Sequence, residues 1–212
     1  MANVAPTILS YSRDDFKARI DLVKGFAQRL HIDVCDGSFV PIKTIGLAQV
    51  YTVNSIPFDL HLMMNNPESQ VETIISLKPE LVIAHFEAKA DLAKLFFDLK
   101  AVHIKVGLAI LHDTTIEEVA EVLSKIDHLL IFTGTLGKNG GTFTPEVLSK
   151  IAEARAINPQ LEIAVDGGIN LDAAKQAVEA GVDVIDCGSF IHDSDSPVEA
   201  FMSIQNLAGA DR

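Results

Sequence analysis

Short apolar runs alternate with longer amphipathic segments along the whole chain. The apolar runs have the length and β-branched content of strands, and a segment with helical periodicity follows each of them. The expected strands are 6–11, 29–34, 58–63, 81–86, 103–110, 128–134, 162–167 and 182–188. The expected helices are 15–28, 68–77, 91–100, 115–125, 145–156, 172–180 and 197–207, and a shorter segment at 46–53 follows the second strand.

The connections between these elements support one parallel sheet. Thr114 and Thr115 offer capping hydroxyls, and Glu117 and Glu118 follow as first-turn carboxylates, which is typical of a helix start. Gly181 follows helix 172–180, where glycine tolerates a left-handed C-cap. Eight β-then-α units without a linker predict an α/β fold, a (β/α)8 TIM barrel that forms a single domain over 1–212. An open, doubly wound sheet is the alternative if two strands are wrongly assigned.

Composition and charge limit the classes of partner. The chain is 48% hydrophobic, which excludes disorder, and its 212 residues suffice for a large core. The 29 acidic and 17 basic side chains give a net charge of −12. That field repels nucleic acid, whereas a small phosphorylated molecule can still be held by backbone N–H groups.

Membrane insertion and secretion are not expected. No run approaches the roughly 18 apolar residues of a membrane span, and the first ten residues lack the features of a signal peptide. Cys35 and Cys187 have no CxxC spacing and are interpreted as free thiols in a reducing compartment. We therefore expect a cytoplasmic protein.

Polar side chains recur at alternate positions near the ends of three strands. His31, Asp33 and Cys35 share one strand face, His61 lies in the third strand, and Asp166 ends the seventh. The C-terminal strand ends form the rim where barrel enzymes keep their chemistry. Two His and two Asp predict a site for one divalent ion, Zn²⁺, Mn²⁺ or Fe²⁺. Local hydrogen bonding within the barrel is the alternative, but burying several ionisable groups without a partner is costly.

Two glycine-containing turns indicate a phosphate site. Gly167 and Gly168 follow the seventh strand, and Gly188 and Ser189 follow the eighth. Barrels often bind phosphate with these two loops and the N-terminus of a short extra helix, and glycine permits close backbone approach.

Several stretches resemble the ribulose-phosphate 3-epimerase family, in the family's order. They are 5–10, 31–41, 44–46, 59–63, 85–88, 165–169 and 187–189, and together they span almost the whole chain. The resemblance implies a barrel of the ribulose-phosphate-binding type in the pentose phosphate pathway. It also implies a homo-oligomer that binds a small ketose phosphate. The implied reaction inverts C3 and converts D-ribulose 5-phosphate to D-xylulose 5-phosphate through an enediolate.

The resemblance also implies roles for individual residues. One divalent metal ion would be held by His31, Asp33, His61 and Asp166. Asp33 and Asp166 would in addition accept and donate the proton. The residues expected to bind the sugar or its phosphate are Thr7, His61, Gly137, Gly140, Gly141, Gly167, Gly168, Gly188 and Ser189. His85 and Glu87 also match the family and are interpreted as supporting these residues.

The loop at 132–143 departs from the family pattern. It keeps the glycines but lacks the usual proline and aromatic residue, and it contains Lys138, which contacts either phosphate or only solvent. Cys35 stands where methionine is usual, as a packing residue or a metal ligand. The reaction is therefore better defined than the substrate. Allulose 6-phosphate is an alternative, and so is a sugar-phosphate-binding barrel with impaired catalysis.

A decarboxylase related to orotidine-phosphate decarboxylase is the enzymatic rival. Those barrels carry Asp-x-Lys-x-x-Asp at the third strand. Here Asp59, His61 and Met64 occupy these positions, so the lysine and the second acid are missing. The third strand therefore favours a metal ligand over decarboxylase chemistry.

Overall fold

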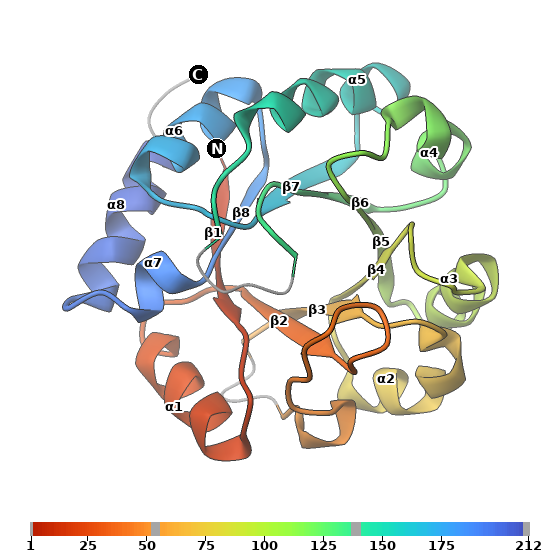
Figure 1. The fold of residues 1–212 in the computed structure, drawn as a ribbon, viewed down its shortest axis with the longest axis horizontal. Coiled ribbons are helices and arrows are strands. Elements are labelled where there is room, and N and C mark those ends of the chain that lie inside the picture. The colour runs from red at the N-terminus through yellow and green to blue at the C-terminus, as the bar shows by residue number, and fades with distance from the viewer. Residues whose placement is uncertain (1, 52–55, 137–140, 210–212) are drawn as a thin grey trace.

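The computed structural model describes residues 2–51, 56–136 and 141–209 (Figure 1). Its strands are β1 Asn3–Ile8, β2 Leu30–Cys35, β3 Phe58–Met63, β4 Leu81–His85, β5 Lys105–Ile110, β6 His128–Phe132, β7 Glu162–Asp166 and β8 Val184–Cys187. Each strand pairs in parallel with the next, and β8 pairs with β1, which closes the barrel. The predicted (β/α)8 TIM barrel is thus confirmed, and the open sheet is excluded.

The helices form a ring around the barrel (Figure 1). They are α1 Arg13–Val23, α2 Val71–Leu77, α3 Leu92–Ala101, α4 Ile116–Leu123, α5 Ser149–Ile157, α6 Leu171–Ala180, α7 Ser189–His192 and α8 Pro197–Gly209. Short 3₁₀ turns are η1 Leu47–Gln49, η2 Pro67–Gln70 and η3 Pro145–Leu148. Within the described residues, no helix is long and apolar enough to cross a membrane.

Most predicted elements exist, but several boundaries were wrong. The first strand, expected at 6–11, is shifted toward the N-terminus because Asn3 already pairs with Val184, and the chain turns at Ser12 to cap α1. The helices expected to begin near 68 and 145 each start with a 3₁₀ turn that has proline at its first position. Sequence alternation indicates the existence of an element better than its exact ends.

The caps expected from the sequence are present. The Thr115 side chain accepts a hydrogen bond from the Glu118 backbone N–H, and the Glu118 carboxylate accepts one from the Thr115 N–H at 2.7 Å. Gly181 takes a φ of +96° at the end of α6. These reciprocal contacts satisfy backbone groups that a helix end leaves without partners.

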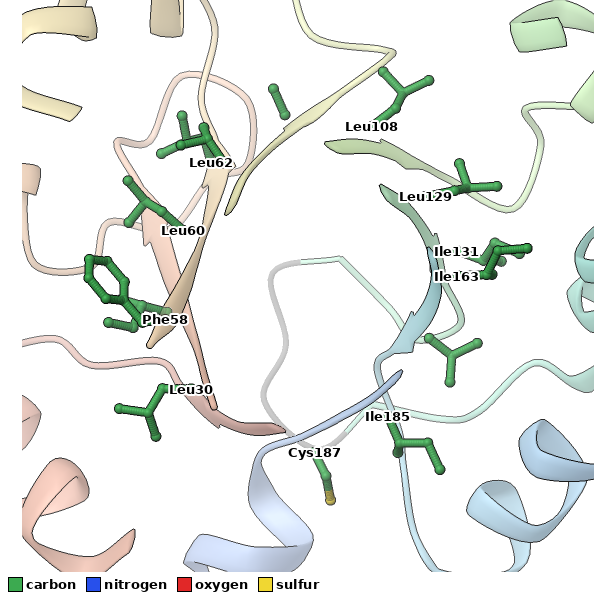
Figure 2. Packing of buried hydrophobic residues seen from close by; sticks show 14 of the residues in the cluster. Leu30, Phe58, Leu60, Leu62, Leu108, Leu129, Ile131, Ile163, Ile185 and Cys187 are labelled. Atoms are coloured by element: carbon green, nitrogen blue, oxygen red, sulfur yellow. The ribbon is translucent and has the colours of Figure 1, made fainter. Parts of the chain in front are cut away.

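Alternate strand residues divide the core into two parts. Outward-facing side chains such as Leu60, Leu62 and Ile163 pack between the sheet and the helices (Figure 2). A separate apolar cluster contains smaller and branched inward-facing side chains: Ala5, Leu81, Ile83, Ala109, Leu130, Ala164 and Val184. These side chains share the barrel interior with a buried polar group formed by His31, Asp59 and Asp186.

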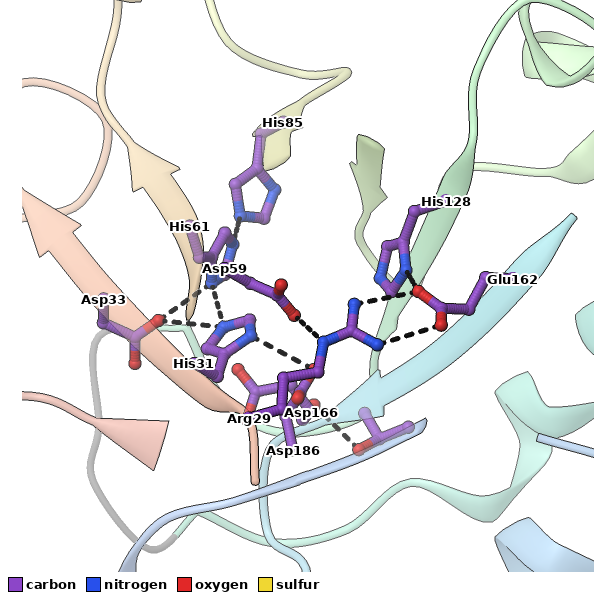
Figure 3. A network of polar contacts seen from close by, with 11 residues as sticks. Arg29, His31, Asp33, Asp59, His61, His85, His128, Glu162, Asp166 and Asp186 are labelled. Carbon is purple, nitrogen blue, oxygen red and sulfur yellow. Dashed lines mark hydrogen bonds and ion pairs between the residues drawn. The ribbon is translucent and has the colours of Figure 1, made fainter. Parts of the chain in front are cut away.

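A charged network closes the end of the barrel where the strands begin (Figure 3). Arg29 donates one hydrogen bond to Asp59 at 2.7 Å and two to Glu162 at 2.9 and 2.8 Å. His128 Nδ1 lies 2.8 Å from the same Glu162 carboxylate. Polar contacts at this end of a TIM barrel serve stability, since chemistry is kept at the opposite rim.

Replacing Arg29 with methionine should destabilise the fold. Asp59 is buried, and Arg29→Met would leave its carboxylate without a cation. We expect the free energy of unfolding to fall by about 3 kcal/mol, the lower end for breaking a buried pair because Glu162 is partly exposed. Urea unfolding followed by circular dichroism measures this loss. Lys17→Met, which removes an exposed ion pair with Asp21, is the control and should leave the midpoint unchanged; an equal result for both variants would contradict the prediction.

Candidate active site

The strand register gathers the predicted metal ligands at the C-terminal rim of the barrel. Asp33 of β2 pairs with His61 of β3, and Asp166 at the end of β7 is the neighbour of Asp186 in β8. His31 precedes Asp33 by two residues and therefore shares its inward face. All five side chains are buried. Each of the four predicted ligands offers one ligand atom, and these four atoms lie within 4.8 Å of one another. Asp186 is not part of this set.

Three of these ligand atoms have the spacing expected around one small cation (Figure 3). His31 Nε2 lies 3.1 Å from His61 Nδ1 and 3.3 Å from Asp33 Oδ1, and His61 Nδ1 lies 2.9 Å from the same Asp33 oxygen. Ligands bound at about 2.0–2.1 Å in tetrahedral or octahedral geometry lie roughly 2.9–3.4 Å apart. The donor set and its spacing therefore fit one divalent first-row ion.

Carboxylates and a third imidazole lie behind the His31 and His61 rings. Asp186 Oδ2 lies 3.2 Å from His31 Nδ1, so a proton on Nδ1 would leave Nε2 to ligate an ion. His61 Nε2 lies 2.9 Å from His85 Nε2, and His85 Nδ1 lies 3.4 Å from Glu87. A carboxylate behind a ligating imidazole is typical of metal sites because it fixes the tautomer.

Glu87 is itself held in place by the loop after β5. Its carboxylate accepts hydrogen bonds from the Leu111 N–H at 2.8 Å and from the Thr114 hydroxyl. Burial opposes ionisation, but these bonds and His85 hold the pKa of Glu87 below its usual range. Glu87 is therefore an anion that can accept the His85 proton.

The environment moves the pKa values of the two predicted catalytic carboxylates in opposite directions. Burial favours the neutral form of Asp33, but hydrogen bonds from His31 and His61 outweigh it and hold the Asp33 pKa below its usual range. Burial and the nearby charge of Asp33 raise the pKa of Asp166 well above its usual range. Environments that shift the pKa values of two neighbouring carboxylates apart are typical of sites with paired base and acid chemistry.

Burial lowers the pKa of His61 to about 4, so this ring is neutral and able to ligate. Burial also opposes a charge on His31, but Asp186 and Asp33 outweigh it and raise the His31 pKa to about 10. A cation at this point therefore competes with the His31 proton.

A cleft opens from this cluster across the ends of β7, β8 and β1. Its lining includes predicted residues from the ligand, sugar and phosphate sets, namely Thr7, Asp33, Asp166, Gly167, Gly168, Gly188 and Ser189. Gly141, Gly168 and Ser189 line an adjoining hollow beside α7. The predicted residues Gly137 and Gly140, and Lys138 between them, lie outside the described residues.

Close backbone approach explains the glycines after β7. Gly167 and Gly168 have φ values of +106° and +73°, which favour glycine. A Cβ on Gly168 would meet the Gly141 carbonyl oxygen and the Phe143 backbone nitrogen at 2.5 Å. Only a residue without a side chain lets the loops after β6 and β7 touch here.

Cys35 lies beside the site without joining it. Its sulfur is 3.7 Å from the Met63 sulfur, and it packs with Val40 and Met63. Burial raises the pKa of its thiol. Cys35 is therefore a packing residue, which is one of the two roles that the sequence suggested.

The sequence did not identify two charged residues of the cleft. Asp186 is a single acid in an apolar strand, and Arg19 comes from helix α1 without any motif. The signal for Asp186 was its inward position two residues before Gly188. No comparable sequence signal pointed to Arg19.

Comparison with known proteins agrees with this geometry. The family model described as the ribulose-phosphate 3 epimerase family matches residues 3–192. Ribulose-phosphate 3-epimerase of Mycobacterium bovis is 36% identical over 98% of this chain and 93% of that protein. The Bacillus subtilis protein of the same name is 31% identical over 97% and 99%.

Solved structures that resemble the chain share its fold at lower identity. One is 3-hexulose-6-phosphate synthase from Salmonella typhimurium, with a TM-score of 0.74 and 15% identity over 97% of this chain and 98% of that one. Another is orotidine 5'-monophosphate decarboxylase from Sulfolobus solfataricus, with a TM-score of 0.66 and 16% identity over 99% and 98%. By its family match and its full-length relatives, the chain belongs to the ribulose-phosphate 3-epimerase family.

Proposed function

We propose that this protein is a metal-dependent epimerase that interconverts D-ribulose 5-phosphate and D-xylulose 5-phosphate by inverting C3. The observation that carries the proposal is the close approach of Asp33 and Asp166, which each offer a ligand atom within 4.8 Å of the other and of those of His31 and His61. The names of the full-length relatives support the pentose phosphate as substrate.

Four side chains would hold the ion: His31, Asp33, His61 and Asp166. A bound Zn²⁺, Mn²⁺ or Fe²⁺ would act as a Lewis acid toward the ketose oxygens and stabilise negative charge that develops there. Asp186 and His85 keep the His31 and His61 rings in the ligating tautomers. The donor set contains no thiolate, because the Cys35 side chain lies outside the cluster.

Asp33 and Asp166 would divide the proton transfer between them. The ionised Asp33 carboxylate takes the proton from C3 and leaves the substrate as an enediolate. Asp166, whose pKa is raised by burial and by the Asp33 charge, would return a proton to the opposite face of C3. A positioned acid or base contributes typically about 10²–10⁴-fold in rate.

The phosphate end of the substrate would lie at the loops after β7 and β8. Gly167, Gly168 and Gly188 expose backbone there, and Ser189 begins α7 beside them. The Thr7 hydroxyl lines the same cleft, is buried and has no hydrogen-bond partner among the described residues, so a sugar hydroxyl can satisfy it.

Isotope exchange tests the reaction. The protein, loaded in turn with Zn²⁺, Mn²⁺ or Fe²⁺, is given D-ribulose 5-phosphate in heavy water, and deuterium at C3 is followed by NMR. We expect deuterium incorporation together with D-xylulose 5-phosphate, and loss of both after chelation. A product one carbon shorter would identify a decarboxylase, and absence of exchange with any ketose phosphate would leave a binding protein. Faster exchange with allulose 6-phosphate would support the same reaction with a different preferred substrate.

Asp166→Asn should separate chemistry from binding. The amide is isosteric and cannot return a proton, so turnover should fall by about 10²–10⁴-fold. Metal content and substrate binding should persist, which elemental analysis and calorimetry measure. Asp195→Asn, an exposed acid elsewhere on the barrel, is the matched control. Near wild-type turnover in Asp166→Asn would remove Asp166 from the mechanism.

A further inference from the structure

Arg19 is a cation in the wall of the catalytic cleft that the proposed chemistry leaves unused. It comes from the middle of α1 and lines the cleft together with Thr7, Leu9, Gly188 and Ser189. Among the cleft-lining residues that the structure describes, it is the only one with a positively charged side chain.

The guanidinium is held from one side only. Its Nε donates to Asp15 Oδ1 at 3.0 Å, one turn earlier on the same helix. Asp15 in turn accepts a hydrogen bond from the Tyr11 N–H, and its own N–H donates to Ser12 Oγ at the helix cap. Within residues 2–51, 56–136 and 141–209, the two terminal nitrogens of Arg19 have no hydrogen-bond partner. Four N–H donors, two on each terminal nitrogen, are therefore left for a ligand.

The Arg19 guanidinium lies close to α7. The Arg19 side chain is only 22% exposed, so it does not extend freely into solvent. Burial lowers the pKa of His192 in α7 to about 4, and the positive charge of Arg19 lowers it further. Arg19 is thus near the short helix that begins at Ser189, where the loops after β7 and β8 meet the cleft.

A positive group would favour an anionic ligand in this cleft. The pKa of Asp33, which lines the cleft, is held below its usual range, and the chain as a whole carries a net charge of −12. A phosphate dianion is repelled by this field, and backbone N–H groups supply only partial charges. Arginine matches phosphate with two parallel N–H donors and keeps its charge at any working pH.

We propose that Arg19 binds the phosphate group of the substrate, at the end of the cleft away from the metal ligands. This inference rests on the proposed epimerase function, because it names the group that recognises the phosphorylated end of that substrate. Asp15 orients the guanidinium from behind, and Gly188 and Ser189 bound the phosphate from the other side.

Arg19→Gln tests the proposal, with Arg13→Gln as the matched control. Arg13 lies on the same helix, is exposed and does not line the cleft, so this variant has the same change in charge. Each variant is assayed with D-ribulose 5-phosphate and with unphosphorylated D-ribulose, and thermal unfolding checks the fold. We expect Arg19→Gln to raise KM for the phosphorylated ketose by about tenfold or more, the equivalent of one charge-assisted hydrogen bond. The effect on KM should exceed the effect on kcat, and Arg19→Lys should restore part of the loss.

Binding of inorganic phosphate tests the role of Arg19 independently of the epimerase reaction. Calorimetry measures its dissociation constant with the metal-loaded wild type, Arg19→Gln and Arg13→Gln, and needs no turnover. Weaker phosphate binding only in Arg19→Gln supports the role of Arg19 even if C3 exchange fails. Equal KM values and equal phosphate affinities in Arg19→Gln and Arg13→Gln would overturn it. A loss of rate that is the same for D-ribulose and D-ribulose 5-phosphate would also overturn it, since that marks a purely structural role.

Discussion

Charge compensation inside a nearly dry barrel is the constraint on which the site depends. His31, Asp33, His61, Asp166 and Asp186 are all buried at one rim, and isolated charges are costly there. In the absence of an ion, nearby His31 and His61 hold the pKa of Asp33 below its usual range, whereas burial and the Asp33 charge raise the pKa of Asp166. The same excess of carboxylates over cations would favour binding of a divalent ion at this cluster.

The barrel separates this reactive end from a structural one. At the opposite end Arg29 joins Asp59 and Glu162, so those carboxylates have a permanent cation. Small and branched apolar side chains such as Ala109 and Leu130 fill the layer between the ends. The two polar groups nevertheless adjoin inside the barrel, because ligand atoms of Asp59, His31 and Asp186 lie within 4.8 Å of one another.

The supporting contacts give the site its rigidity. His61 is backed by His85, which faces Glu87, and Glu87 is anchored by the backbone after β5. Each ring is therefore held by groups from a neighbouring strand or loop. Ligands fixed in this way lie close to their bound positions before an ion arrives, which reduces the cost of ordering them.

The sequence by itself determined the alternation of strands and helices, the inward direction of His31 and Asp33, and the family. These follow from local periodicity and short motifs, since side chains two apart share a strand face. Sequence could not place the start of β1, because that boundary depends on pairing between Asn3 and Val184 at the other end of the chain. It also missed Asp186 and Arg19, whose meaning depends on which remote groups face them. Closure of the barrel alone decided that a carboxylate of β8 backs His31 and that a helical arginine reaches the cleft, because only tertiary contacts join segments so far apart in the chain.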